Sequence, residues 1–245
     1  MEDRDDRQRG PALSGRVSAH AIRPFVPADA EICAAIFDLP EDSWTPAYDA
    51  ERRPVGEEVV GRTVRHARQS LGIGVDETDP DYILRREAQL LIDYGDSPIV
   101  GPDGPDDTDG LRAGLRAPDA AGLTRAAVTG SVRLFAVLDR RRHTTLLYAD
   151  AGATAGDLPR LEALAAAAVD AAHGQMDVYL VADPAADVAG TELALIRDTA
   201  GEFADRYRPA PGATFVIRPD GYLCFAADTA PTGADLVSQL KLTFL

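Results

Sequence analysis

The fold is decided by the stretch H-T-T-L-L-Y-A-D-A-G-A-T-A-G-D-L-P-R-L-E-A-L-A-A-A-A, residues 143–168. Its beginning, 143–150, is rich in β-branched and apolar residues and predicts a strand. The alanine-rich segment from Leu158 to Ala172 predicts a helix, because its large apolar residues recur at helical spacing. One face of this helix carries Leu158, Leu161, Leu164 and Ala165. The stretch therefore predicts a strand and a helix joined by a short loop.

Strands and helices alternate on both sides of this stretch. The other expected elements are a strand over 133–139, a buried strand over 176–183, a helix over Thr191–Tyr207, a hairpin over 214–228 and a helix over Ala234–Leu245. The hairpin is predicted from its Pro219-Asp220-Gly221 turn, since proline and glycine supply the dihedral angles of a tight turn. This order predicts an α/β fold in which a mixed sheet is flanked by helices.

The N-terminal residues show a different pattern. Residues 1–45 are expected to form a partly disordered extension, because its first part is charged and polar without an apolar period. Residues 46–100 are expected to form a helical segment, which is separated from a domain at 111–245 by the linker-like residues 101–110. The chain therefore has an N-terminal helical appendage ahead of its α/β domain.

Within the helical segment, a first helix is predicted from Glu51, with Pro54 in its first turn and Gly72 as its stop. A second helix is expected from Asp79 or Asp81 to about Leu90, and Leu90–Val100 is expected to be a strand or an extended segment. The apolar side of the first helix consists of Val55, Val59, Val60 and Val64. Four uncovered valines would form a patch that soluble monomers rarely expose. We therefore expect a homodimer or a partner chain to cover it, unless residues 20–40 do so.

Composition excludes several classes of partner. The chain has 245 residues, a formal net charge of −15 and a pI of about 4.6. An acidic surface repels phosphates, so neither nucleic acid nor an anionic membrane surface is expected as a partner. No apolar run approaches the roughly 20 residues that span a bilayer, and the N-terminus lacks the apolar core of a signal peptide. Cys33 and Cys224 lie far apart in the sequence, which favours a reduced, cytoplasmic protein.

No catalytic, cofactor-binding or metal site is expected. The four histidines (His20, His66, His143 and His173) show no metal-ligand spacing, and we expect them at the surface or at helix ends. Gly101–Gly110 resembles a calcium loop, but Pro105 holds its first ligand position and Arg116 stands where a bidentate acid is needed. Cys224 and Cys33 are expected to be small core residues.

Two charged groups leave alternatives open. Glu51, Arg52 and Arg53 would form pairs and dipole contacts at a helix start, or would bind a charged ligand. Arg140–Arg142 lie at an expected hairpin turn and would be solvated, or would meet an acidic partner.

The order of elements resembles the thioredoxin fold. In that family, two cysteines in a CxxC motif follow the first long strand, and the corresponding positions here are near Gly152 and Ala155. Ala213 stands where the family has a cis-proline. The resemblance therefore implies a thioredoxin-like domain without redox chemistry, since disulfide exchange needs a thiolate.

Several motifs also resemble the C-terminal part of FAD-dependent aromatic hydroxylases of the phenol hydroxylase and polyketide-tailoring type. They are, in chain order, Y-D-A-E-R-R-P-V (48–55), A-Q-L-L-I-D-Y-G-D-S-P-I-V (88–100), G-L-R-A-P-D (114–119), R-L-F-A-V-L-D with H-T-T-L-L as a first hairpin (133–147), and V-I-R-P-D-G-Y (216–222). The resemblance covers about residues 46–245. The family binds FAD through a GxGxxG turn in its N-terminal half, which is missing here; Gly72–Gly74 is expected to be a helix stop.

The resemblance implies that this chain binds no cofactor itself, with FAD present only if a partner subunit supplies it. Three functions remain open: an accessory or interaction protein in the oxidative tailoring of aromatic or polyketide compounds, one subunit of a split FAD-dependent monooxygenase, or an idle relic of a truncated gene. Hydroxylation by this chain alone is not expected.

Overall fold

A computed structural model describes residues 46–70, 90–100 and 111–244. The contacts divide the chain into two units, Met1–Pro46 and Ala47–Leu245, and nearly all described residues belong to the second. The predictions for residues 1–45, for the second helix from Asp79 or Asp81 and for the linker at 101–110 lie outside the described residues, as do Gly72–Gly74 and Cys33.

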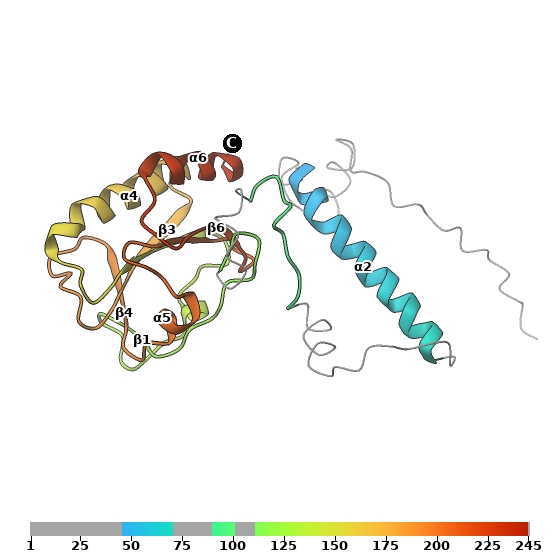
Figure 1. Cartoon of the computed structure of the whole chain (residues 1–245), viewed down its shortest axis with the longest axis horizontal. Helices are drawn as coiled ribbons and strands as arrows, with labels where there is room; N and C mark the ends of the chain where they lie inside the picture. Colours follow the sequence, from blue (N-terminus) through green and yellow to red (C-terminus); the bar gives the residue numbers. More distant parts are fainter. Residues whose placement is uncertain (1–45, 71–89, 101–110, 245) are drawn as a thin grey trace, which may run out of the picture. The chain divides into compact units, whose positions relative to one another are not determined.

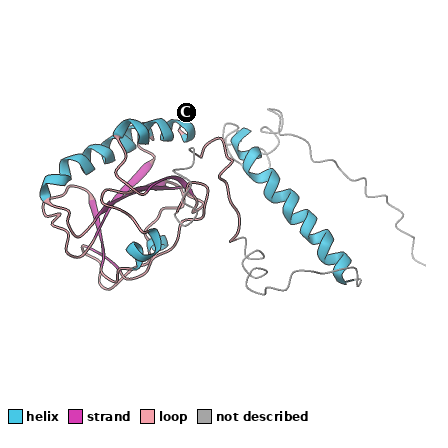
Figure 2. Ribbon diagram, in the orientation of Figure 1, coloured by secondary structure: helices cyan, strands magenta, loops and turns pink. Residues whose placement is uncertain are grey.

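The centre of the fold is a six-stranded sheet (Figure 2). Its strands are β1 (Leu123–Arg125), β2 (His143–Ala149), β3 (Met176–Ala182), β4 (Ala194–Asp198), β5 (Thr214–Ile217) and β6 (Leu223–Ala227). The strand order is β1-β4-β3-β2-β5-β6. β2, β3 and β4 run parallel, whereas β1 and β5 are antiparallel to their neighbours and β5 forms a hairpin with β6. The predicted mixed sheet is therefore confirmed.

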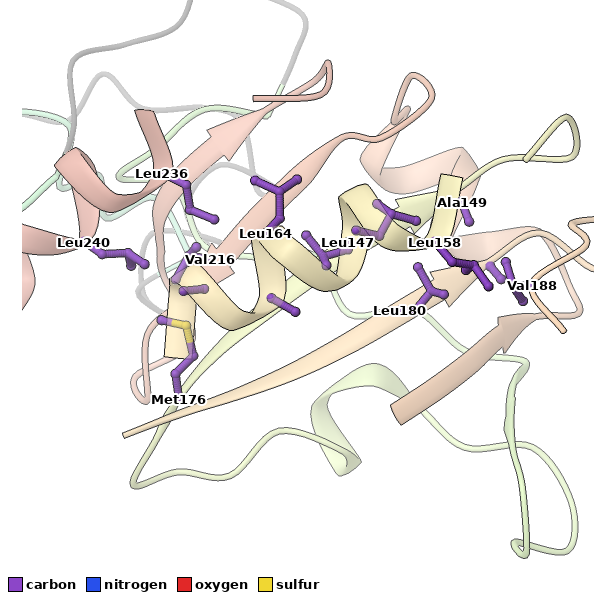
Figure 3. Packing of buried hydrophobic residues seen from close by; sticks show 14 of the residues in the cluster. Leu147, Ala149, Leu158, Leu164, Met176, Leu180, Val188, Val216, Leu236 and Leu240 are labelled. Atoms are coloured by element: carbon purple, nitrogen blue, oxygen red, sulfur yellow. The ribbon is translucent and has the colours of Figure 1, made fainter. Parts of the chain in front are cut away.

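Helices cover both faces of the sheet (Figure 1). α4 (Leu158–Ala171) and α6 (Gly233–Thr243) lie together on one face, and α5 (Glu202–Tyr207) lies on the other. Alternate residues of β2 point to opposite faces: Leu147 packs under α4 and α6, and Leu146 packs in the cluster that contains α5. Figure 3 shows the first of these clusters, in which leucines of α4 and α6 meet residues of the central strands.

The connections match the thioredoxin-like fold that the sequence predicts. β2, α4 and β3 form a β-α-β unit with two parallel strands, and β5, β6 and α6 form a hairpin followed by a helix. The hairpin turns at Pro219-Asp220-Gly221 as predicted, with Gly221 at φ +88°. Arg218 N donates to the Tyr222 carbonyl at 2.8 Å, and Gly221 N donates to the Arg218 carbonyl at 2.9 Å.

The helix predicted over Thr191–Tyr207 is wrong in its first half. Ala194–Asp198 is the strand β4, which pairs in parallel with β3, and only Glu202–Tyr207 is helical. The two are separated by a turn in which Gly201 has φ +74°. Asp198 accepts hydrogen bonds from the backbone N–H of Phe203 and Ala204, so its side chain caps α5. Burial beside β3 therefore overrides the helical spacing of this apolar run.

The strand predicted over 133–139 is also wrong, and with it the expected first hairpin. Only a short 3-10 helix forms there, η2 (Leu134–Ala136). Its backbone N–H groups are satisfied locally: Leu134 N donates to the Ala120 carbonyl and Phe135 N to the Asp119 carboxylate. β2 pairs with β3 and β5 instead. Strand β1 was not predicted from the sequence, and it pairs with β4 at the edge of the sheet.

The appended helix is α2 (Pro46–Ser70), which begins before the predicted Glu51. Pro54 therefore lies inside the helix and not in its first turn. Leu90–Val100 forms turns and irregular backbone without a strand. None of the helices in the described ranges is both long enough and apolar enough to cross a membrane.

His143 departs from the expected surface position, because its side chain is partly buried. It lies edge-on to Phe244, with ring centroids 4.7 Å apart. Burial, and secondarily the positive charge of Arg218, lowers the pKa of His143 from 6.5 to about 4, against a small opposing effect of Asp220. His173 matches the expectation, since it is exposed and follows the end of α4.

The buried histidine predicts a specific pH dependence of stability. Its folded-state pKa lies below the unfolded value, so the unfolded chain binds the proton first as the pH falls. The contribution of neutral His143 to the free energy of unfolding is complete above pH ~6.5. It falls by up to about 3 kcal/mol as the pH decreases toward 4. We expect His143→Leu to flatten this part of the pH profile in urea unfolding. Identical profiles for the two proteins would contradict the prediction.

Candidate functional site

The loop between β2 and α4 occupies the position where thioredoxins carry their cysteines. Asp150 follows β2 directly, and its carboxylate accepts a hydrogen bond from Gly152 N at 3.2 Å. Thr154 and Asp157 form a capping box before α4: Thr154 N donates to the Asp157 carboxylate at 2.9 Å. These bonds lower the pKa of Asp157, so the start of α4 is occupied by a carboxylate of the chain itself.

The loop has the geometry of a redox site but none of its chemistry. The two positions equivalent to the cysteines, Gly152 and Ala155, are exposed. The one thiol in the described part of the chain is Cys224, which is fully buried in the sheet and confirms the predicted core position. Burial raises the pKa of Cys224 to about 12, so its thiolate is negligible at neutral pH. The described residues therefore contain no nucleophile for disulfide exchange.

A cavity of about 270 Å³ lies between this loop and the residues before β5. Its walls include Tyr148, Gly152, Arg160, Pro211 and Gly212. Position 212 needs glycine, because its φ is +79° and a Cβ there would lie 2.6 Å from the Arg160 guanidinium. None of the described peptide bonds is cis, including the bond before Ala213. The charged groups of its lining are the Arg160 guanidinium and the carboxylates of Asp150 and Asp157.

The second feature is a group of charged and aromatic residues, here called the Arg218 cluster. It consists of Glu51 and Arg52 of α2, Tyr94 and Ser97 of the 90–100 segment, and Arg218, Asp220 and Tyr222 of the β5–β6 hairpin. Its centre is a bidentate ion pair: the Arg218 guanidinium donates to both carboxylate oxygens of Glu51, at 2.5 and 2.7 Å. The side chains are 9% and 2% exposed, so both charges are removed from water.

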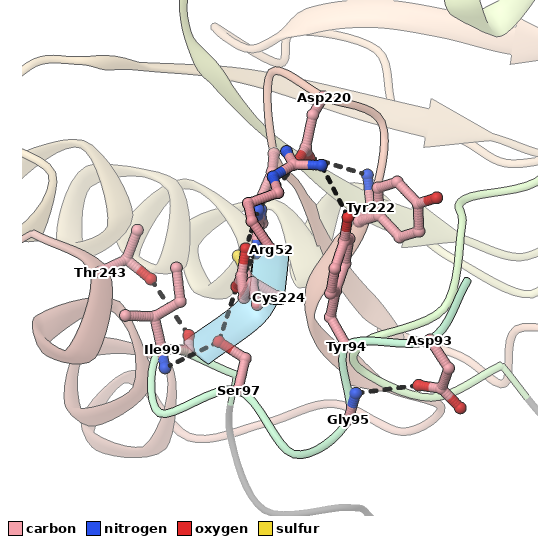
Figure 4. A network of polar contacts seen from close by, with 12 residues as sticks. Arg52, Asp93, Tyr94, Gly95, Ser97, Ile99, Asp220, Tyr222, Cys224 and Thr243 are labelled. Carbon is pink, nitrogen blue, oxygen red and sulfur yellow. Dashed lines mark hydrogen bonds and ion pairs between the residues drawn. The ribbon is translucent and has the colours of Figure 1, made fainter. Parts of the chain in front are cut away.

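The remaining members satisfy the other polar atoms of this pair. Ser97 Oγ donates to Glu51 at 2.6 Å, and Arg218 Nη2 also donates to Asp220 at 2.7 Å. Arg52 donates to the Tyr94 hydroxyl at 2.8 Å. Figure 4 shows Arg52 between Tyr94 and Asp220, with Ser97 nearby. A buried ion pair is stable only when such additional bonds compensate for lost hydration.

Two pKa shifts follow from this arrangement. Burial alone would lower the pKa of Arg218, but its hydrogen bonds to Glu51 and the charges of Asp220 and Glu51 outweigh burial and raise it. Burial raises the pKa of the Tyr94 hydroxyl, although nearby Arg52 acts in the opposite direction. The guanidinium therefore stays charged and the phenol stays neutral at neutral pH.

The same region contains a close approach of two loops. Gly114 has φ +91°, and a Cβ on it would lie 2.3 Å from the backbone N of Gly95. Tyr94 N donates to the Gly114 carbonyl at 3.0 Å, and Gly114 N donates to the Leu223 carbonyl at 2.7 Å. Tyr94 and Tyr222 pack edge-on above this contact, with centroids 4.6 Å apart. Gly114 therefore allows the 90–100 segment to lie against β6.

The Arg218 cluster joins the motifs that suggested a family resemblance. Y-D-A-E-R-R-P-V supplies Glu51 and Arg52, the 88–100 motif supplies Tyr94 and Ser97, and V-I-R-P-D-G-Y supplies the hairpin residues. Neither alternative stated for Glu51 and Arg52, pairs at a helix start or a charged ligand, included these distant partners within the chain. The sequence shows Glu51 in one motif and Arg218 in another, but no sequence pattern indicates that these two residues form an ion pair.

The other candidate residues form no site. Arg142 pairs with Asp177 at 2.8 Å, whereas Arg140 and Arg141 are exposed, as expected of a solvated turn. The turn precedes β2 but does not belong to a hairpin. Within the described ranges, no group of histidine, cysteine, aspartate and glutamate residues is arranged to hold a metal ion.

No protein-family model matches the sequence, and no curated protein matches it significantly. Solved structures do match. The flavin-dependent monooxygenase PieE, solved with FAD and substrate, aligns over 88% of this chain and 42% of its own, with 19% identity and a TM-score of 0.54. Aklavinone-11 hydroxylase, solved with FAD and aklavinone, aligns over 60% and 25%, with 18% identity and a TM-score of 0.42.

Thioredoxin-like proteins also match. The thioredoxin domain of a thiol-disulfide oxidoreductase from Bacteroides vulgatus aligns over 56% of this chain and 100% of its own, with 15% identity and a TM-score of 0.41. This chain spans less than half the length of PieE. The chain therefore has a thioredoxin-like fold and shares its fold with part of a flavin-dependent monooxygenase.

The central ion pair predicts a large effect of one small substitution. Glu51→Gln removes one buried charge and leaves Arg218 without its main partner, so we expect a loss of about 3–5 kcal/mol in the free energy of unfolding. Glu57→Gln, on an exposed turn of the same helix, is the matched control and should change stability by less than about 0.5 kcal/mol. Urea unfolding measures both, and equal effects would refute a structural role of the pair.

The loop without thiols predicts no thiol–disulfide reductase activity. We expect insulin reduction in the presence of dithiothreitol to proceed at the rate of dithiothreitol alone. The double variant Gly152→Cys/Ala155→Cys supplies thiols at exposed positions and is the comparison in which activity is expected. Reduction above background by the unaltered chain would contradict the prediction.

Proposed function

We propose that this chain is a cytoplasmic, redox-inactive, thioredoxin-like accessory protein of a FAD-dependent monooxygenase that tailors aromatic or polyketide compounds. The observation that carries the proposal is the extent of the likeness to PieE, 88% of this chain. The thioredoxin-like residues 111–244 make up little more than half of the chain, so the likeness extends into the segment that contains α2.

The loop between β2 and α4 supports a binding role over a catalytic one. A thioredoxin-like sheet without an accessible thiol keeps its shape but loses its reaction. What remains is a rigid domain with α2 joined to it through the Arg218 cluster. Such a domain suits contact with another protein chain.

The ends of the helices support the proposal that this chain does not hold FAD. Dinucleotides bind where a glycine-rich turn presents free backbone N–H groups at a helix start. Here a capping box of Thr154 and Asp157 closes the 3-10 turn Ala155–Asp157 that leads into α4, and a capping box of Thr232 and Asp235 closes the start of α6. Each capping box places a carboxylate where a pyrophosphate would have to lie, and like charges repel.

A second candidate is one subunit of a split monooxygenase that works only with a separate flavin-binding chain. The contacts of Glu51 and Arg52 favour it, because they join the first turns of α2 to the hairpin, where a partner chain would meet both elements. In the first case the flavoprotein hydroxylates its substrate without this chain, and in the second it does not. An idle relic would bind no flavoprotein.

The test begins with the purified chain and FAD. We expect no saturable change in flavin fluorescence anisotropy, and a yellow protein with absorbance near 450 nm, roughly where oxidised flavins absorb, would contradict the proposal. The tagged chain is then recovered from extracts of the cells that encode it. A flavoprotein that co-purifies with the chain, and whose hydroxylation rate rises when the chain is added, supports the proposal. The proposal is refuted if no flavoprotein binds the chain and the chain leaves the hydroxylation rate of flavoproteins from the same cells unchanged.

A further inference from the structure

The cavity between the β2–α4 loop and the residues before β5 contains a guanidinium whose hydrogen-bond donors the described residues do not use. It belongs to Arg160, in the first turn of α4, and it lies over Gly212: a Cβ at position 212 would be 2.6 Å from Nη2 and 3.3 Å from Nη1. Among the described residues, none forms a hydrogen bond or an ion pair with this guanidinium. A guanidinium has five N–H donors and no acceptor, so this wall of the cavity is suited to a carboxylate.

The same cavity contains two carboxylates that each have an unused oxygen. Asp150 accepts a hydrogen bond from Gly152 N at 3.2 Å, and it does so through Oδ2. Asp157 accepts from the backbone N and the hydroxyl of Thr154, again through Oδ2. In the described part of the chain, no donor bonds to the Oδ1 atom of either residue. Both carboxylates can therefore accept hydrogen bonds from an ammonium group.

The three charges and the volume of the cavity select a class of ligand. A simple carboxylate ion would be attracted by Arg160 but repelled by Asp150 and Asp157, and a simple amine would meet the opposite conflict. A molecule with one carboxylate and two ammonium groups provides an opposite charge for each of the three residues. The cavity volume of about 270 Å³ lies below the ~300–1,000 Å³ of pockets that hold drug-sized ligands, so the ligand is smaller than a nucleotide.

We propose that this cavity binds an α-amino acid with a basic side chain. The carboxylate of the amino acid pairs with Arg160, its α-ammonium group with Asp150, and the cationic end of its side chain with Asp157. The methylene groups of the side chain lie against Leu161 and Pro211, which belong to the cavity wall. Because the charged groups are partly exposed to water, the affinity is in the millimolar range. This binding goes beyond the proposed accessory function and does not depend on it.

An NMR titration of the full chain with L-lysine and three analogues tests the site. Cadaverine is lysine without its carboxylate, ε-aminocaproate lacks the α-ammonium group, and L-norleucine lacks the side-chain ammonium group. We expect lysine to shift the backbone amide signals of Gly152 and Gly212 in a saturable way. Each analogue should bind about fivefold more weakly than lysine, since each loses one partly exposed ion pair.

Two charge-neutralising variants assign the ion pairs to residues. In Arg160→Gln the ligand carboxylate has no cationic partner, so lysine and cadaverine should bind equally. In Asp150→Asn the amide oxygen can still accept from Gly152 N, but the charge is lost, so lysine and ε-aminocaproate should bind equally. Arg140→Gln and Asp170→Asn are the matched controls, because both residues are exposed and lie outside the cavity lining, and they should leave the preference for lysine unchanged.

Three results would overturn the proposal. The first is a chain whose Gly152 and Gly212 signals do not respond to millimolar lysine. The second is equal binding of lysine and its three analogues, which would show that the charged groups recognise no particular ligand. The third is a preference for lysine that persists in both Arg160→Gln and Asp150→Asn, which would place the binding elsewhere on the chain.

Discussion

The bidentate ion pair between Glu51 and Arg218 is the interaction on which the rest of the described structure depends. It connects α2 to the β5–β6 hairpin, across 167 positions of sequence. Removing both charges from water is unfavourable by several kcal/mol per ion, and this is offset only by good geometry and complete hydrogen bonding. Ser97 and Asp220 supply the further hydrogen bonds. The pair therefore requires three separate segments to be in place at once.

The hairpin transmits this anchoring to the sheet. Arg218 directly follows β5, and β5 pairs with β2 at the centre of the sheet. On the other side, Gln239 and Thr243 of α6 donate to the Ile99 carbonyl at 3.4 Å, which holds the end of the 90–100 segment. Figure 4 shows Thr243 beside Ile99. Each of these bonds is weak by itself, but together they join the appended segments to the sheet and its helices.

The core of the thioredoxin-like part does not depend on the residues of the loop between β2 and α4. The leucines of α4 pack under the sheet regardless of what stands at positions 152 and 155, because those positions face solvent. The identity of the residues at these two positions therefore leaves the core unaffected. Carboxylates stabilise the loop: Asp150 and Asp157 accept hydrogen bonds from its backbone N–H groups.

The sequence alone determined the elements whose signals are local. β2, α4, β3, the β5–β6 hairpin and α6 were predicted close to their observed bounds, because apolar spacing and turn residues act over a few positions. The absence of thiols from the loop between β2 and α4 and the core position of Cys224 could also be predicted from the sequence. Tertiary structure decided the rest. Ala194–Asp198 is a strand only because β3 offers an edge to pair with, and Glu51 is buried only because Arg218 lies opposite it. Such partners lie far away in the sequence, and no local pattern encodes which distant residue will satisfy a strand edge or a buried charge.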